Sequence, residues 1–244
     1  MSEHRTLSIF GSGEFEPWSV EIDRLAIDRA RTGNGSVLIL PTASAPEGDD
    51  VFHNWGQKGL DHYEGMEVPA RVSALKSRAD AHSDDHIAQI EDASLIYFSG
   101  GNPKYLADTL RDTPFWKAVM EAVDAGASLS GCSAGACIMG EIAPDTLEEQ
   151  DWDKALATPG LKVFPGVTFG PHWNMLEHYI PGLTSVFLNR VPEGVTLITL
   201  DEDTAIAGDG DKWTVHGLRE VGVRRNGDLL GTYKAGDTFE TPAF

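Results

Sequence analysis

The sequence predicts a three-layer α/β fold of the doubly wound type, in which helices cover both faces of a mostly parallel sheet. Apolar runs typical of strands alternate with segments typical of helices. The run at 37–40 is continuously apolar and the run at 94–98 nearly so, as expected of parallel strands that are buried on both faces. Beyond residue 200, short alternating segments separated by acidic and glycine-containing turns predict a C-terminal antiparallel β extension.

The first half of the chain supplies alternating strands and helices. Strands are expected at 7–10, 37–40, 66–72, 94–98 and 127–130, and helices at 17–31, 49–63, 83–91, from 103, 114–123 and from 136. Pro103 and Pro114 suit the first position of a helix, and Ser83 suits a helix cap. Gly56 and Gly59 are expected to interrupt the second helix, and Gly126 to end the helix that starts at Pro114.

The second half is more irregular. Residues 141–166 are acidic and resemble a loop, and 167–173 form an extended stretch with a histidine at its tip. A helical segment to about 191 and a strand at 195–200 follow, and then short strands near 205–207, 213–215 and 221–223. Nothing marks a linker or a repeat, so we expect a single domain spanning 1–244.

Composition limits the functions that need to be considered. The net charge of −19 with only 19 Lys and Arg argues against a nucleic-acid partner. No apolar run reaches the ~18 residues of a membrane span and no secretory signal is evident, so we expect a cytoplasmic chain without a membrane partner. Cys132 and Cys137 are too few for a disulfide framework. A homodimer is compatible with the sequence.

The segment 129–136, LSGCSAGA, predicts a nucleophile elbow. It reads as a strand, a sharp turn and a helix, with Ser133 at the apex and Gly131 and Gly135 two residues to either side. The N–H of Ala134 would lie at the start of the helix, where it could stabilise an oxyanion. An ordinary β–α turn also favours glycine and serine. Cys132 lacks the flanking glycines and is expected to be a buried packing residue.

A serine nucleophile needs a base and an acid that orients the base. His172 is the best placed base, because it follows a strand and a Gly-Pro turn, whereas His178 and His216 are less favourably placed. Glu202 follows the strand at 195–200 and is the preferred acid. Its competitors are Asp145, Glu177, Asp201 and Asp203.

Two other motifs have simpler explanations than a ligand site. The turn Gly11-Ser12-Gly13 does not complete the dinucleotide-binding pattern, and it suits a tight β–α turn near the active-site rim. His82 and His86 have the i, i+4 spacing of metal ligands, but the same segment is explained by a capped helix. We therefore expect no cofactor and no metal.

Four motifs in order, FSGGN, SLSGCSAGA, FGPHW and LDEDTAI, resemble those of the dipeptidase E/cyanophycinase family of serine peptidases. The resemblance spans about residues 7–225 and implies a flavodoxin-like fold, like that of class I glutamine amidotransferases. It implies Ser133 as nucleophile, His172 as base and Glu202 as acid. It also implies an oxyanion hole from the N–H groups of Gly101 and Ala134, with Asn102 and the Trp of the FGPHW motif, Trp173, in the substrate site.

The chain departs from the sequence pattern of the family directly after His172. Relatives that act on aspartyl substrates carry arginines there, whereas Trp173–His178 contains no basic residue other than histidine. The resemblance therefore implies cleavage of a small peptide or isopeptide but assigns no side-chain preference. Two alternatives remain open: an α/β-hydrolase-type esterase with His216 as base, and an inactive relative that binds a ligand.

Overall fold

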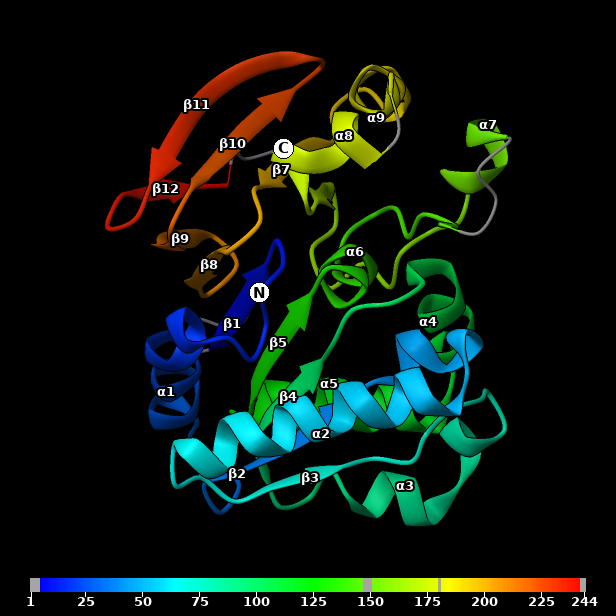
Figure 1. Cartoon of the computed structure of the whole chain (residues 1–244), viewed down its shortest axis with the longest axis vertical. Coiled ribbons are helices and arrows are strands. Elements are labelled where there is room, and N and C mark those ends of the chain that lie inside the picture. The colour runs from blue at the N-terminus through cyan, green and yellow to red at the C-terminus, as the bar shows by residue number, and fades with distance from the viewer. Residues whose placement is uncertain (1–4, 147–150, 180, 242–244) are drawn as a thin grey trace.

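The computed structural model describes residues 5–146, 151–179 and 181–241, and its larger sheet contains the predicted parallel strands. Five parallel strands lie side by side in the order β1, β5, β4, β2, β3 (Figure 1). Their bounds are Leu7–Phe10 for β1, Ser128–Cys132 for β5, Ala93–Phe98 for β4, Ser36–Leu40 for β2 and Ala70–Val72 for β3. The expected mostly parallel sheet is confirmed.

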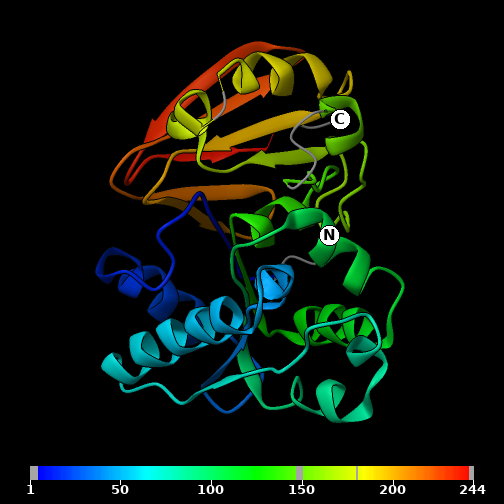
Figure 2. The same ribbon diagram turned by 45° about the vertical axis from the view of Figure 1, so that its right-hand side comes forward.

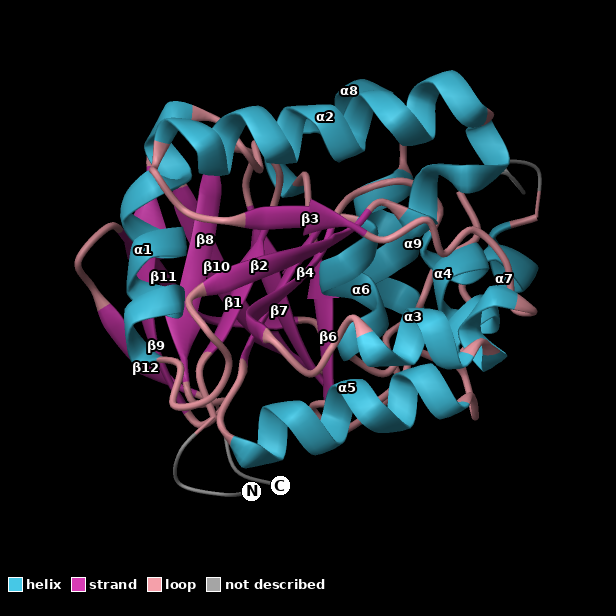
Figure 3. Cartoon of the chain, turned by 90° about the horizontal axis from the view of Figure 1, so that it is seen from below, coloured by secondary structure: helices cyan, strands magenta, loops and turns pink. Residues whose placement is uncertain are grey.

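Helices cover both faces of this sheet, as Figure 3 shows for α2 on one side and α5 on the other. Successive strand residues alternate between the two faces, so Phe10 and Tyr97 pack with α1 and α2, whereas Ile9 and Ile96 pack with α4, α5 and α6. The helix bounds are Val20–Arg29 for α1, Asp49–Gly65 for α2, Asp84–Ala88 for α3, Pro103–Leu110 for α4, Pro114–Ala125 for α5 and Ala134–Met139 for α6. The predicted three-layer arrangement is confirmed.

The expected interruption of the second helix is wrong, because α2 is continuous. A Cβ on Gly56 would lie 2.9 Å from Val72 Cγ1, and a Cβ on Gly59 would lie 2.8 Å from Ile39 Cδ1. The two glycines therefore allow α2 to approach β2 and β3 closely. Their role is packing, which outweighs their poor helix propensity.

The C-terminal part is antiparallel, as predicted. Strand β8 (Thr204–Gly208) pairs antiparallel with β1 and extends the larger sheet through β9 (Lys212–Gly217) to β12 (Thr238–Glu240). The strands at 167–170 and 196–200, in contrast, leave this sheet. They join a smaller sheet in the order β11, β10, β7, β6, which lies above the larger sheet in Figure 2.

The smaller sheet holds the segments that carry His172 and Glu202. Its strands are β6 (Val167–Gly170), β7 (Thr196–Leu200), β10 (Glu220–Arg225) and β11 (Asp228–Lys234). Two short helices, α8 (Leu176–Tyr179) and α9 (Leu183–Arg190), follow β6, and Leu183 and Phe187 of α9 pack with Leu197 of β7. His172 and Glu202 thus lie just after neighbouring parallel strands.

The acidic segment 141–166 is mostly irregular, as expected, but contains the short helix α7 (Trp152–Ala155). Residues 147–150 of this segment lie outside the described residues. In the parts of the chain that the structure describes, no helix is both long enough and apolar enough to cross a membrane.

Candidate active site

Ser133 lies in a sharp turn between β5 and α6. Its backbone has φ 50° and ψ −106°, a conformation that is rare outside strained functional turns. The Ser133 N–H donates to the Phe10 carbonyl oxygen at 3.1 Å, which ties the turn to the end of β1. The local geometry is that of a nucleophile elbow.

The two glycines around Ser133 are required by close backbone contacts. A Cβ on Gly131 would lie 2.4 Å from the Gly135 carbonyl oxygen, and a Cβ on Gly135 would lie 2.2 Å from the Phe98 carbonyl oxygen. Any side chain would push α6 away from the ends of β4 and β5. The glycine spacing therefore reflects how tightly the helix closes over the sheet.

Three side chains form a chain of hydrogen bonds at this turn. His172 Nε2 lies 3.0 Å from Ser133 Oγ, and His172 Nδ1 lies 2.9 Å from Glu202 Oε1. His172 has a left-handed backbone with φ 53°, which turns the chain sharply after β6. With Nδ1 protonated toward the Glu202 carboxylate, Nε2 is free to accept the proton of Ser133.

Glu202 is held by several groups. The Tyr179 hydroxyl donates to Glu202 Oε1 at 2.9 Å, and the Glu202 N–H donates to Asn174 Oδ1 at 2.8 Å. Partial burial raises the pKa of Glu202, but the hydrogen bonds from His172 and Tyr179 outweigh it and bring the pKa below its ordinary value. Glu202 is therefore a carboxylate at neutral pH. The hydrogen bond to this carboxylate in turn raises the pKa of Tyr179.

Two of the competing acids have other contacts. Asp145 Oδ1 accepts a hydrogen bond from Asn102 Nδ2 at 3.0 Å. Glu177 accepts from the N–H groups of Gly182 and Thr184, at 2.8 and 3.0 Å, at the start of α9. The carboxylate of Glu177 thus caps a helix.

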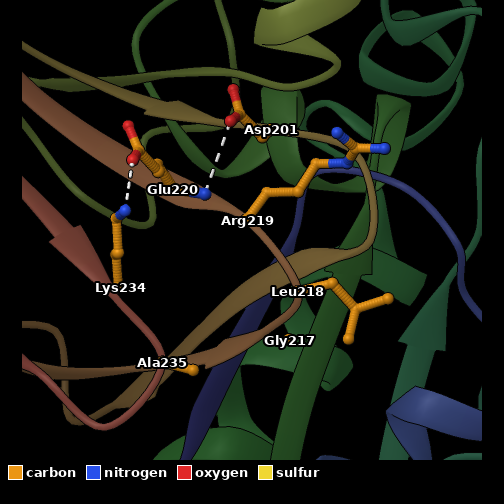
Figure 4. Close-up of a pocket in the computed structure, with 7 residues that line it drawn as sticks. All are labelled: Asp201, Gly217, Leu218, Arg219, Glu220, Lys234 and Ala235. Atoms are coloured by element: carbon orange, nitrogen blue, oxygen red, sulfur yellow. Dashed lines mark hydrogen bonds and ion pairs between the residues drawn. The ribbon is translucent and has the colours of Figure 1, made fainter.

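Asp201 and Asp203 flank Glu202 but face other neighbours. Asp201 Oδ2 accepts from the Glu220 N–H at 3.4 Å, and Figure 4 shows this contact in a pocket of about 420 Å³. A 2.9 Å ion pair between Lys234 and Glu220 borders the same pocket. Asp203 Oδ1 lies 2.5 Å from where a Cβ of Gly13 would be. Among the four residues considered beside Glu202, none has a described contact with His172.

The other candidate histidines lie elsewhere. His216 is half-buried in β9, and burial lowers its pKa, although Glu21 of α1 acts in the opposite direction. The charges that act on its ring, Glu21 and Arg29, belong to α1 rather than to the elbow. The ring of His178 packs against Tyr179. Among these three histidines, His172 is the one in contact with Ser133.

Cys132 is buried behind the elbow. Burial raises the pKa of its thiol well above the ordinary value, and the neighbouring Glu14 carboxylate raises it further. Burial also raises the pKa of Cys137 to about 12. Since the thiolate is the reactive form of cysteine, both residues are suited to packing rather than to nucleophilic attack.

Ser133 and His172 line a pocket of about 720 Å³, a volume within the usual range for small-molecule sites. Gly101 and Asn102, both expected at this site, line it. Asn102 Oδ1 also caps α4 by accepting from the Tyr105 N–H at 2.7 Å. Further lining residues are Ser12, Gly13, Glu14, Glu16, Pro46, Glu47, Trp55, Lys58, Gly100, Thr146, Leu176, Tyr179 and Leu183.

Trp173, which we expected at the substrate site, is not among the residues that line this pocket. Its ring lies edge-on to Phe187 of α9, and the guanidinium of Arg224 lies over it at 5.8 Å from the centroid. Trp173 therefore packs α9 and the smaller sheet together. Its neighbour His172, in contrast, faces the pocket.

Residues 7–216 match the profile of peptidase family S51. The chain belongs to this family. The membership expected from the four motifs, in a family of serine peptidases, is thereby confirmed.

Relatives and solved structures agree with this membership. The chain is 28% identical over 188 residues to a cyanophycinase of Geminocystis herdmanii and 24% identical over 212 residues to one of Trichormus variabilis. The matches cover 72% and 84% of this chain, and 64% and 68% of those proteins. A peptidase of an acI-B1 actinobacterium superposes with a TM-score of 0.87 at 30% identity, over 98% of both chains.

A more distant structure supports the fold alone. A putative peptidase E of Listeria monocytogenes superposes with a TM-score of 0.62 at 19% identity, over 88% of this chain and 99% of its own. The expected α/β fold is thus shared with solved structures of peptidases.

Glu14 and Tyr179 line the pocket of this family member and contact its reactive groups, but neither was expected as a site residue from the sequence. Glu14 follows the glycine turn after β1, so its position at the carboxyl edge of the sheet could have drawn attention to it. Tyr179 comes from a short helix in a segment with no pattern that points to the pocket. Both contact residues of the elbow or of the hydrogen-bond chain.

Proposed function

We propose that this chain hydrolyses an amide bond of a small peptide or isopeptide through a covalent acyl-enzyme. The observation that carries the proposal is the chain of hydrogen bonds from Ser133 through His172 to Glu202, at 3.0 and 2.9 Å, at the edge of an open pocket. This geometry matches the roles of nucleophile, general base and orienting acid.

In the proposed reaction, Ser133 Oγ attacks the substrate carbonyl carbon while its proton passes to His172 Nε2. The Glu202 carboxylate stabilises the resulting imidazolium. The tetrahedral oxyanion is stabilised by the N–H groups of Gly101 and Ala134. His172 then protonates the departing amine, the carbonyl re-forms, and an acyl-enzyme on Ser133 remains.

Water completes the cycle. His172 Nε2 accepts a proton from water as the water oxygen attacks the acyl carbon. Collapse of the second tetrahedral intermediate returns this proton to Ser133 Oγ and releases the new carboxylic acid. The enzyme ends in its starting protonation state, and no cofactor is consumed.

The charges that line the pocket affect which substrate side chains it can accept. Among the described residues that line it, Glu14, Glu16 and Glu47 are acidic, and Lys58 lies with its ammonium over the Trp55 ring at 4.7 Å. An acidic substrate side chain would meet mostly like charge. We therefore propose small peptides with neutral or basic side chains beside the cleaved bond.

A peptide panel tests this function. We expect the wild-type chain to hydrolyse α-linked dipeptides and tripeptides with neutral or basic side chains beside the cleaved bond faster than their aspartyl counterparts or β-aspartyl isopeptides, with the cleavage products detected by mass spectrometry. Methyl esters of the same acids serve as the matched comparison. Hydrolysis of the esters with no cleavage of any amide would contradict a peptidase and favour an esterase, and no turnover of either would favour an inactive relative.

A further inference from the structure

Glu14 lines the pocket and is buried although it carries a carboxylate. It follows the turn Gly11-Ser12-Gly13 at the end of β1 and is 6% exposed. The turn is fixed by a hydrogen bond from the Gly11 N–H to the Thr204 carbonyl oxygen at 2.8 Å. A Cβ on Gly11 would lie 2.1 Å from the Asp201 carbonyl oxygen, so the turn is pressed against the segment that leads to Glu202.

The carboxylate of Glu14 joins two catalytic turns. Its Oε1 accepts a hydrogen bond from the Gly100 N–H at 3.0 Å, and its Oε2 accepts one from the Cys132 thiol at 2.8 Å. Gly100 precedes Gly101 of the proposed oxyanion hole, and Cys132 precedes the nucleophile Ser133. A Cβ on Gly100 would lie 3.3 Å from Glu14 Oε1 and 3.8 Å from Ser133 Oγ, so both oxygens lie beside the same glycine.

The turn at 100–101 depends on such external contacts. Gly101 has φ 137°, and a Cβ there would lie 2.3 Å from the Ala43 carbonyl carbon, so Gly101 can carry no side chain that would hold the turn. The Ser99 N–H donates to the Leu40 carbonyl oxygen at 3.2 Å, and the Asn102 N–H donates to the Ala43 carbonyl oxygen at 2.8 Å. Between these two anchors, the Gly100 N–H is bound by Glu14 alone among its described contacts.

We infer that Glu14 is a positioning residue that sets the distance between the oxyanion turn and the nucleophile. This inference rests on the proposed function. One rigid carboxylate that binds both turns fixes the Gly101 N–H relative to Ser133 Oγ before substrate arrives. Preorganised donors of this kind contribute mainly to kcat, because they act on charge that develops in the transition state.

Glu14 also lines the pocket, so the alternative role is to bind a cationic group of the substrate. That role predicts a change in KM rather than in kcat when the charge is removed. Two conservative variants separate the roles. Glu14→Gln keeps the side-chain length and an oxygen that can accept from Gly100, but removes the charge. Glu14→Asp keeps the charge but is one methylene too short to reach both turns.

We expect Glu14→Asp to lower kcat by roughly 30–100-fold with KM within about threefold, and Glu14→Gln to lower kcat by less than about 10-fold. The rate of covalent labelling of Ser133 by a fluorophosphonate should also fall more in Glu14→Asp than in Glu14→Gln. Substrates are the peptides that the wild-type chain hydrolyses.

Glu141→Ala is the matched control. Glu141 also accepts from a glycine N–H, that of Gly166 at 2.8 Å, and pairs with Lys162, but it lies outside the pocket lining. We expect the Glu141→Ala substitution to lower the midpoint of thermal unfolding and to leave kcat within about threefold of wild type.

Two results would overturn the positioning role of Glu14 while leaving the proposed function intact. One is a wild-type kcat in Glu14→Asp. The other is a KM that rises more in Glu14→Gln than in Glu14→Asp, with kcat unchanged in both. A wild-type chain that neither hydrolyses peptides nor takes the label would instead overturn the proposed function, and this inference with it.

Discussion

Replacing Ser133 with alanine is expected to lower kcat by at least ~10⁴-fold, because the variant has no atom that can form the acyl-enzyme. The fold should be unaffected. Alanine adopts the strained φ of 50° with the same difficulty as serine, and the described hydrogen bond of the Ser133 side chain is to His172 rather than to the core. We therefore expect the midpoint of thermal unfolding to stay within about 2 °C of wild type.

Ser130→Ala is the matched control for this variant. Ser130 lies in β5, is buried, and its hydroxyl has no hydrogen-bond partner among the described residues. Removing that hydroxyl should leave kcat within about threefold of wild type. If Ser133→Ala retained more than about 1% of wild-type activity, hydrolysis would not pass through this serine.

Replacing His172 with alanine is expected to lower kcat by a similar factor, at least ~10⁴-fold, because nucleophile and base act as one unit. His172 Nε2 is the described base within hydrogen-bond distance of Ser133 Oγ. The variant should still bind substrate, because the rest of the pocket lining is unchanged. Steady-state kinetics on a peptide that the wild-type chain cleaves would measure the loss.

His216→Ala provides the comparison. His216 lies in β9 beside the charges of α1, and its loss should change kcat by less than about threefold. The reverse pattern, with activity lost in His216→Ala and kept in His172→Ala, would favour the esterase alternative and contradict the assigned base.

The parallel half of the fold could be predicted because its signals are local. Continuous apolar runs such as 37–40 favour strands that are buried on both faces, and Pro103 and Pro114 suit the first position of a helix. The elbow is also local, since Gly131 and Gly135 are required by the turn itself. Ser133 and His172 follow strands of two different sheets, so their 3.0 Å contact depends on how the sheets pack, and their catalytic roles stay predictions.

The features that could not be predicted depend on which segments pair in space. Strand patterns at 167–170 and 196–200 do not reveal that the two strands form a second sheet. Trp173 adjoins His172 in sequence, but the sharp backbone turn at His172 sends the indole toward Phe187. The contacts of Glu14 with Gly100 and Cys132 join residues far apart in the chain, and no pattern within one segment encodes them.

The central claim is that Ser133 is the nucleophile of a working serine peptidase. The most direct test is to treat the wild-type chain with a fluorophosphonate and locate the adduct by mass spectrometry of a proteolytic digest. We expect one adduct, on Ser133, that forms in step with the loss of peptide hydrolysis and is absent from His172→Ala. An adduct on another residue, or full inactivation with Ser133 unmodified, would contradict the claim.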